Sequence, residues 1–392
     1  MLNTKKYNFD ENPSRKGTQS EKYDALISYY GTNNIDPFWV ADMDLQSPKF
    51  LTDALQKRVN HSIYGYTTSD IKIFNAIKWW MKYEHKINVD IDSISLSPSV
   101  VTTMCMVIKA FTNIGDNIAV FSPVYGPFFT SITSNNRNVI DIPLKVESNR
   151  FKFPNEEIKK ILYDKKVKMI FLCNPHNPGG RIWEKNELEW LVKICTKNNI
   201  LIFSDEIHSD IVFDPYSHNS ILGIKDSEKI SIMAHSIGKT FNTSGLKSSF
   251  SIVPNLSLRK SLRRQHKLSH VENINLFGKI ALQTLFSEEG VEYKKELLDY
   301  LKTNTSLVYD KLSNNALLEP MLPQATFLLW CNFNKCGSWQ ETSKNLINNA
   351  KVALSGGTFF GSSGKGWFRI NCGHPRLPLL KATDRICKIF SH

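Results

Sequence analysis

Short runs of consecutive apolar residues alternate with longer amphipathic stretches through the middle of the chain. Such runs are typical of strands that are buried on both faces, and the amphipathic stretches between them are typical of helices. The predicted strands are 93–97, 116–123, 167–174, 200–207, 229–236 and 248–254. Helical patterns over 100–112 and 184–199 separate some of them. This alternation predicts an α/β fold with a mostly parallel sheet covered by helices.

The two ends of the chain have a different character. The first 35 residues are polar and predict an extended arm, whereas long helical patterns follow residue 255. An apolar hairpin-like run and a glycine-rich stretch near the C-terminus suggest a smaller α+β domain. We predict an arm with part of the small domain over 1–50, a large domain over 51–288 and a C-terminal small domain over 289–392.

Composition narrows the function classes. The 392 residues are 41% hydrophobic and carry a formal charge of +12, but the lysines are scattered and no nucleic-acid-binding motif occurs. The seven cysteines form no CxxC pair and are typical of buried thiols in a reducing compartment. No signal-peptide core or membrane-length apolar run is present. We expect a cytoplasmic protein that binds neither nucleic acid nor membrane.

Polar residues gather where the predicted strands end. In open α/β sheets, ligands bind beyond the carboxyl ends of the strands, so these residues are candidates for one site. The five clusters are Ser97–Ser99, Ser122–Tyr125, Asn174–Gly180, Ser204–Glu206 and the stretch from Ser236 to Lys239.

One part of this predicted site suits a phosphate. The helix that starts after Ser99 offers the free backbone N–H groups of Val100 and Val101 at its positive end. Ser236 and Lys247 add a hydroxyl group and a cation.

The remaining groups suit an aromatic aldehyde with a basic nitrogen. Tyr125 offers a flat face, Asp205 can hold a ring nitrogen protonated, and Lys239 can form a Schiff base. Taken singly, Asp205 is equally a strand-end cap, Tyr125 a packing residue and Lys239 a solvated cation. Taken in order, the groups describe a site for pyridoxal 5′-phosphate (PLP).

Several blocks of the sequence resemble those of a known enzyme family. The chain is similar to the fold-type I PLP enzymes of the class I/II aminotransferase superfamily, and more narrowly to the MalY/PatB group of cystathionine β-lyase-like enzymes. The resemblance implies a large domain with a mostly parallel seven-stranded sheet, plus a small domain built from the arm and the C-terminal part. The blocks are FWVADMDLQSP, YGYT, SPSVV, SPVYGPFF, NPHNPGGRIW, SDEIHSDIVF, SIGKTFNTSGL and FRINCGHPR.

The resemblance also implies roles for single residues. Lys239 is the expected Schiff-base lysine, Asp205 the partner of the pyridine nitrogen, and Tyr125 the residue that stacks on the ring. Asn177 and His208 are expected near the phenolic oxygen of PLP. The phosphate is expected at the amides of the SPSVV block.

Other implied roles concern the substrate and a second subunit. Arg369 is expected to bind the substrate carboxylate, and Tyr66 to reach the phosphate of a neighbouring subunit in a homodimer with shared active sites. Three positions depart from the usual family pattern. Ser99 replaces a common glycine, Gly179 a common threonine, and Lys247 a common arginine.

The predicted reaction is β-elimination from L-cystathionine or another L-cysteine S-conjugate. Lys239 would remove the Cα proton, a thiolate would leave from Cβ, and pyruvate and ammonia would follow. Two alternatives remain open at this point. One is an aminotransferase that uses the same residues, and the other is a regulatory protein that binds a partner on the same fold.

Overall fold

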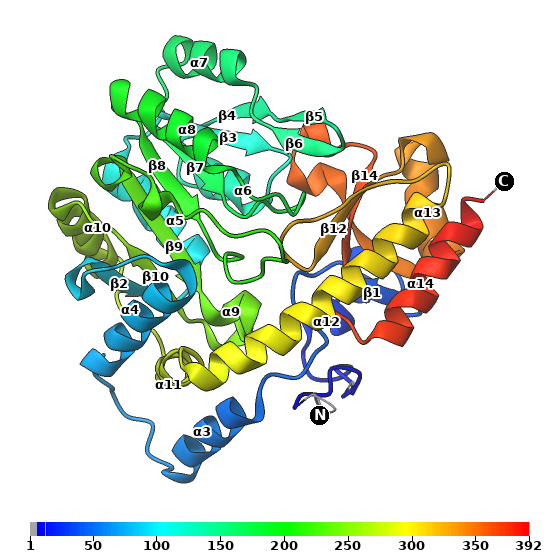
Figure 1. Cartoon of the computed structure of the whole chain (residues 1–392), viewed down its shortest axis with the longest axis horizontal. Coiled ribbons are helices and arrows are strands. Elements are labelled where there is room, and N and C mark those ends of the chain that lie inside the picture. Colours follow the sequence, from blue (N-terminus) through cyan, green and yellow to red (C-terminus); the bar gives the residue numbers. More distant parts are fainter. Residues whose placement is uncertain (1–5, 12, 392) are drawn as a thin grey trace.

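The computed structural model describes residues 6–11 and 13–391. Its largest sheet has seven strands in the order β2-β10-β9-β8-β7-β3-β4 (Figure 1). Strand β10 is antiparallel to both of its neighbours, and all the other pairs are parallel. The strands are β2 (Ile94–Ser97), β3 (Asn117–Ser122), β4 (Asn138–Pro143), β7 (Met169–Cys173), β8 (Leu201–Asp205), β9 (Ser231–Ser236) and β10 (Ser249–Ile252).

Both faces of this sheet are apolar, because its central strands are apolar at successive positions. In β3, Val120 belongs to the core on one face and Phe121 to the core on the other, since neighbouring side chains of a strand point in opposite directions. Helices α5, α6 and α10 contribute to the first core, and α4, α8, α11 and α12 to the second. Their bounds are α4 (Ile71–His85), α5 (Val100–Phe111), α6 (Pro127–Thr133), α8 (Lys185–Lys197), α10 (Leu256–Leu268), α11 (Leu276–Leu285) and α12 (Glu288–Ser313).

A second sheet joins the two ends of the chain. Strand β1 pairs in parallel with β13, so the N-terminal region completes a sheet that is otherwise built from C-terminal residues. Helix α12 runs from the large sheet to this smaller one (Figure 1). The strands, in spatial order, are β1 (Asp36–Phe38), β13 (Val352–Gly356), β14 (Trp367–Asn371), β12 (Leu328–Asn332) and β11 (Glu319–Met321). They pack with α13 (Trp339–Asn348) and α14 (Arg376–Ile389).

The predicted fold class is confirmed, and the remaining elements add detail that the pattern did not give. The arm contains two short helices, and a small hairpin follows β4. No helix in the described part of the chain is both long enough and apolar enough to cross a bilayer. The domain boundaries at residues 50 and 288 stay predictions. The other elements are α1 (Glu21–Asp24), α2 (Leu26–Tyr30), α3 (Lys49–Asn60), β5 (Lys145–Glu147), β6 (Arg150–Lys152), α7 (Asn155–Asp164) and α9 (Ile237–Thr240).

A buried cluster of charges fixes the arm to the body of the protein. Its centre is Asp44, whose Oδ1 lies 2.6 Å from Arg15 Nη1 and 3.4 Å from Lys22 Nζ. Asp44 Oδ2 accepts a hydrogen bond of 2.6 Å from the Tyr23 hydroxyl and lies 3.0 Å from His374 Nδ1. The side chains of Lys22 and Asp44 are completely buried, so each depends on the other members for its charge.

We expect the substitution Asp44→Asn to destabilise the protein at pH 7 by about 3 kcal/mol, because it removes one of the two carboxylates, Asp42 being the other, that pair with Arg15 and the buried Lys22. Burial opposes ionisation, but His374 and Lys22 hold the pKa of Asp44 well below its ordinary value. A lowered pKa stabilises the fold above the unfolded value of about 4, and this gain is lost as the pH falls further.

The difference between wild type and variant should therefore shrink below about pH 4. Denaturant unfolding over a pH series measures it. Asp53→Asn is the matched control, because Asp53 pairs with Lys49 on an exposed helix surface. A difference that is independent of pH would contradict the role of the Asp44 charge.

Candidate active site

A cavity of about 390 Å³ lies at the carboxyl ends of the central strands of the large sheet. It brings together ten of the twelve residues predicted from the sequence, leaving out only Tyr66 and Arg369. The lining residues are Ala41, Pro98, Ser99, Val100, Val101, Tyr125, Cys173, Asn177, Asp205, Ile207, His208, Ser236, Lys239, Ser244, Lys247 and Ser248.

Lys239 reaches the cavity from α9, the single helical turn that follows β9. The helix begins at Ser236, whose hydroxyl oxygen accepts a hydrogen bond from Gly238 N at 3.0 Å. Lys239 Nζ donates a hydrogen bond of 2.6 Å to the carbonyl oxygen of Ala41. Burial, followed by the charge of Arg369, lowers the pKa of Lys239 to about 8. Its amine therefore becomes a nucleophile or a base at a much lower pH than that of an ordinary lysine.

Asp205 ends strand β8 and is 5% exposed. Its Oδ1 accepts a hydrogen bond of 3.1 Å from Ile207 N. Burial raises the pKa of Asp205 to about 6, and the Ile207 N–H and Lys239 act against this shift. A buried carboxylate with so little compensation gains from a cationic partner in the cavity, such as a protonated ring nitrogen.

His208 lies close to this carboxylate in the chain and is also buried. Burial holds the pKa of His208 well below its ordinary value, so its imidazole is neutral. Its Nδ1 has no hydrogen-bond partner among the described residues. The cavity therefore contains a polar group that a bound ligand can satisfy.

The other end of the cavity suits an anion. Ser99 caps helix α5, and its hydroxyl oxygen accepts a hydrogen bond of 3.0 Å from Thr102 N. The amides of Val100 and Val101, in the first turn, have no acceptor within the helix and line the cavity. Lys247 adds a cation to the same lining.

The hydroxyl groups at this end have different partners. Ser236 Oγ donates its hydrogen to Ser248 O at 2.7 Å, and it accepts from the backbone of its own helix. Ser248 Oγ has no partner in the described part of the chain. Ser248 and Ser244 also line the cavity, but the prediction from the sequence did not include them. The feature of the sequence that could have identified Ser244 and Ser248 is their position among the hydroxyl residues around Lys239.

Arg369 comes from strand β14 of the small sheet and lies beside the cavity. Its Nη1 donates to Asn177 Oδ1 at 3.1 Å, and its Nη2 donates to Trp39 O at 2.7 Å and to Ser355 Oγ at 3.2 Å. Its Nε is buried and has no partner among the described residues. No carboxylate of the described chain forms an ion pair with this guanidinium, although it is 3% exposed. Such a buried cation is a suitable partner for a substrate carboxylate.

Tyr66 lies elsewhere. It is fully exposed in the stretch between α3 and α4, and it does not line the cavity of its own chain. Tyr125 does line the cavity, and its ring lies 6.4 Å from that of Phe359. The structure of one chain thus assembles the predicted site without Tyr66.

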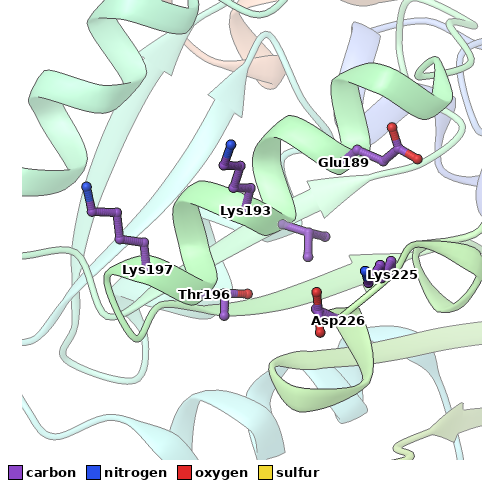
Figure 2. Close-up of a pocket in the computed structure, with 7 residues that line it drawn as sticks. Glu189, Lys193, Thr196, Lys197, Lys225 and Asp226 are labelled. Atoms are coloured by element: carbon purple, nitrogen blue, oxygen red, sulfur yellow. The ribbon is translucent and has the colours of Figure 1, made fainter.

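A second hollow of about 510 Å³ lies between α8 and the turn at Lys225 and Asp226 (Figure 2). Its lining mixes cations such as Lys193 with the carboxylates of Glu189 and Asp226. None of the residues predicted for the site contributes to it. The chemistry therefore belongs to the cavity at the strand ends.

The residues of that cavity fit PLP. The amides of α5 and Lys247 suit its phosphate, Asp205 suits its ring nitrogen, and the amine of Lys239 suits its aldehyde carbon. The unpartnered His208 Nδ1 and Ser248 Oγ are available to further oxygen atoms of the cofactor.

Comparison with known proteins agrees with this fit. Residues 40–386 match the family model described as aminotransferase class I and II. The chain is 35% identical to cystathionine beta-lyase PatB of Bacillus subtilis, over 93% of this chain and 95% of PatB. It is 27% identical to protein MalY of Escherichia coli, over 96% of each chain.

Solved structures give the same result. Cystalysin from Treponema denticola, which contains PLP, superposes with a TM-score of 0.93 at 27% identity over 98% of each chain. The PLP-bound C-S lyase from Staphylococcus hominis, in complex with L-cycloserine, superposes with a TM-score of 0.92 at 27% identity, also over 98% of each chain.

The chain therefore belongs to the class I and II aminotransferase family of PLP-dependent enzymes. Within this family it is a member of the MalY/PatB-type C–S lyase group, as the sequence blocks predicted, and its cofactor is PLP.

We expect the cofactor-free protein to be methylated at Lys239 by formaldehyde and cyanoborohydride at a rate that rises with pH through a midpoint of about 8. The reason is that only the free amine reacts, and burial favours this form. Peptide mass spectrometry at a series of pH values measures the rate for each lysine. Lys185 is the internal control, because its side chain is exposed to solvent. The same midpoint for both residues would contradict the influence of the cavity on Lys239.

Proposed function

We propose that this protein is a PLP-dependent carbon–sulfur β-lyase that cleaves L-cystathionine or other L-cysteine S-conjugates to a thiol, pyruvate and ammonia. The observation that carries the proposal is that Lys239 and Asp205 line one cavity and Arg369 lies beside it, hydrogen-bonded to the lining residue Asn177. The choice of a lyase over an aminotransferase is supported by the 35% identity to PatB, against 24% to the aspartate aminotransferase of Pyrococcus horikoshii.

Different residues of the cavity would bind different parts of PLP. Val100 and Val101 would donate their amides to the phosphate, Tyr125 would cover one face of the ring, and Lys239 would hold the aldehyde carbon covalently. Asp205 would keep the ring nitrogen protonated, because a buried carboxylate stabilises an adjacent cation. When bound, PLP supplies an electron-withdrawing ring that delocalises the negative charge left at Cα.

The remaining steps depend on two cations of this chain. Arg369, beside the cavity and hydrogen-bonded to Asn177, would bind the substrate carboxylate, which would fix the direction of the Cα–H bond. Lys239, released when the substrate amine takes its place on the aldehyde carbon, would take the Cα proton, and its pKa of about 8 suits a base that works near neutral pH. The bond from Cβ to sulfur would then break, and the electron pair would leave with the thiolate. Water would hydrolyse the remaining three-carbon unit to pyruvate and ammonia.

We further propose that the enzyme is a homodimer in which Tyr66 reaches the phosphate of the partner subunit. Tyr66 is fully exposed, as is expected of a side chain whose contacts lie in another chain. The neighbouring Ile63, Tyr64 and Ile71 are also more than half exposed. Such a group of large apolar side chains is typical of an interface between subunits.

The test of the lyase proposal is a reaction without a keto acid. Holoenzyme given L-cystathionine should release pyruvate, ammonia and a free thiol in equal amounts over many turnovers. An aminotransferase would stop after one turnover, because its cofactor would retain the amino group, and would resume on addition of a keto acid. Assays of all three products over time, with and without a keto acid, distinguish the two reactions. Such a stall without thiol would overturn the lyase proposal.

We expect the substitution Arg369→Lys to raise KM for L-cysteine S-conjugates by about tenfold or more, while PLP binding changes little. A lysine keeps the charge but loses the planar pair of N–H donors, and a hydrogen bond to a charged group is worth about 1.5–3 kcal/mol. Steady-state kinetics and PLP titration measure the two effects. The control is Arg385→Lys, since Arg385 pairs with Asp36 at the surface. Loss of PLP with an unchanged KM would place Arg369 at the phosphate instead.

A further inference from the structure

A second buried carboxylate lies behind the active site. Asp210 follows Asp205 by five residues and is 2% exposed. Its Oδ1 accepts hydrogen bonds from Trp80 Nε1 at 3.0 Å and from His85 Nε2 at 2.8 Å. Its Oδ2 accepts a hydrogen bond of 2.8 Å from Thr240 Oγ1.

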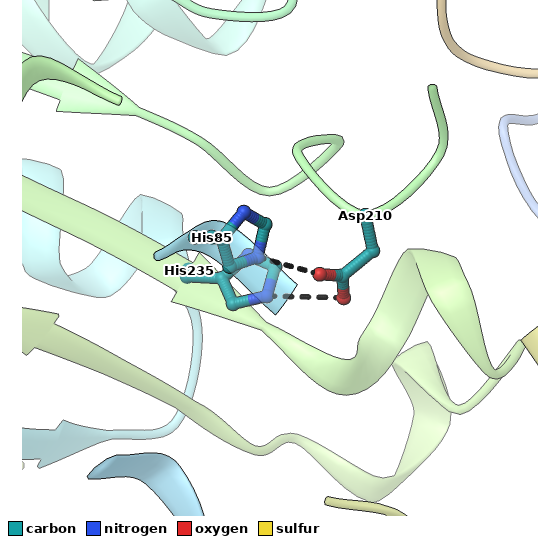
Figure 3. Close-up of side chains that lie close together, drawn as sticks. All are labelled: His85, Asp210 and His235. Atoms are coloured by element: carbon teal, nitrogen blue, oxygen red, sulfur yellow. Dashed lines mark hydrogen bonds and ion pairs between the residues drawn. The ribbon is translucent and has the colours of Figure 1, made fainter. Parts of the chain in front are cut away.

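His235 completes this cluster and points toward Asp210 from β9 (Figure 3). Its Nε2 lies 3.2 Å from Asp210 Oδ2, and its Nδ1 lies 2.9 Å from the carbonyl oxygen of Glu206. Its Nε2 faces a carboxylate oxygen, which only accepts, whereas its Nδ1 has the Ser209 hydroxyl at 3.4 Å as well as the Glu206 carbonyl oxygen; the Asp210 carboxylate favours the charged form of the ring. The pKa of His235 agrees, since burial opposes the charge but Asp210 raises the value above normal. His218 Nε2 lies 2.8 Å from Oε2 of the nearby Glu206.

The cluster is not a metal site, although His85, Asp210 and His235 have suitable ligand atoms close together. The indole N–H of Trp80 can only donate, and it donates directly to the Asp210 carboxylate. Four donors surround the two oxygens of Asp210. They occupy the carboxylate lone pairs that a metal ion would need.

Two of the donors to Asp210 are chain neighbours of active-site residues. Thr240 follows Lys239, and His235 precedes Ser236. Adjacent side chains of a strand point to opposite faces, and adjacent side chains of a helix differ by about 100° in direction. Asp210 holds the side chains of Thr240 and His235 on the side that faces away from the cavity. These contacts therefore fix the rotation of α9 and of the end of β9. This in turn fixes the direction in which Lys239 enters the cavity.

The hydrogen bond from Thr240 is important for the position of α9, because the side chains of this short helix donate few others. Of the four residues of this helix, only Lys239 and Thr240 donate side-chain hydrogen bonds within the described structure. The bond from Lys239 to Ala41 O uses the same nitrogen that holds PLP. Once that nitrogen is attached to the cofactor, the bond from Thr240 to Asp210 is the remaining hydrogen bond that a side chain of α9 donates within the described structure.

We propose that Asp210 is a positioning residue, which acts through Thr240 and His235 to aim Lys239 at the cofactor and at the Cα proton. The inference rests on the proposed roles of Lys239 and Asp205. Asp210 does not line the cavity. Its effect passes through the two chain neighbours that it binds.

Substitution of Asp210 itself would strip His235 of its counter-ion and threaten the fold. The test therefore uses the holoenzyme with Thr240→Val, which removes one hydroxyl and keeps the shape of the side chain. Thr240→Ser restores the hydroxyl. Thr342→Val is the control for a buried threonine, because Thr342 is 1% exposed and its hydroxyl has no partner in the described structure.

Two readouts are measured for each variant. The first is the pH midpoint at which the visible absorbance of bound PLP changes, which needs no substrate and no particular reaction. The second is kcat and KM for L-cystathionine. We expect Thr240→Val to raise the pH midpoint, because a less constrained Lys239 nitrogen approaches water and its charged form is better solvated. We also expect kcat to fall by about tenfold with little change in KM, since a small misplacement of a catalytic group is costly.

Recovery of both values in Thr240→Ser, with wild-type values in Thr342→Val, would support the proposal. A Thr240→Val enzyme with the wild-type midpoint and kcat would overturn it, and Asp210 would then have only a structural role. If the wild-type enzyme itself releases no thiol from L-cystathionine, the proposed function is wrong, whatever the variants show. The comparison of absorbance midpoints still decides the role of Asp210.

Discussion

The active site depends on residues 39–42, a short segment whose backbone carbonyl groups accept hydrogen bonds from residues on the sides of both sheets. Trp39 O accepts from Arg369 of the small sheet, and Ala41 O accepts from Lys239 beyond the large sheet. Asn371 Nδ2, also from the small sheet, donates to Val40 O and to Asp42 O at 2.6 Å each. The segment cannot form both sets of bonds unless the two sheets keep a fixed relative position. The distance between the substrate-binding cation and the catalytic amine is therefore set by the backbone of residues 39–42.

Two carboxylates near the end of β8, Asp205 in the strand and Asp210 in the loop after it, show how the surroundings of a buried group decide its pKa. Asp205 and Asp210 are both nearly inaccessible to solvent. Asp210 is surrounded by four donors, and its pKa lies well below the ordinary value although burial acts against this. Asp205 accepts one backbone hydrogen bond from Ile207, and burial raises its pKa to about 6. The difference in hydrogen bonding marks Asp210 as a satisfied structural charge and Asp205 as a group that gains from a cationic ligand.

The sequence allowed the strand ends to be recognised, since apolar runs followed by polar residues have a clear local signal. This was enough to predict that Lys239, Asp205 and the amides of α5 lie at one edge of a sheet. Arg369 had no such signal, because it reaches the site from the second sheet, and it was found only by resemblance. The Asp210 cluster was missed for a similar reason, since its partners come from distant parts of the chain, and this pairing is created only by tertiary packing.

The active site and its support alternate along the chain. Ser236 lines the cavity while His235 binds Asp210, and Lys239 lines the cavity while Thr240 does the same. Asp205 follows the same rule, because the next side chain, Glu206, accepts from Ser204 Oγ at 2.9 Å and from Ile221 N at 2.8 Å. Each of these three groups thus has a chain neighbour anchored in the protein interior. Since a peptide bond joins the two, the interior hydrogen bonds limit the freedom of the group in the cavity and would continue to do so when Lys239 exchanges its bond to Ala41 O for the ligand.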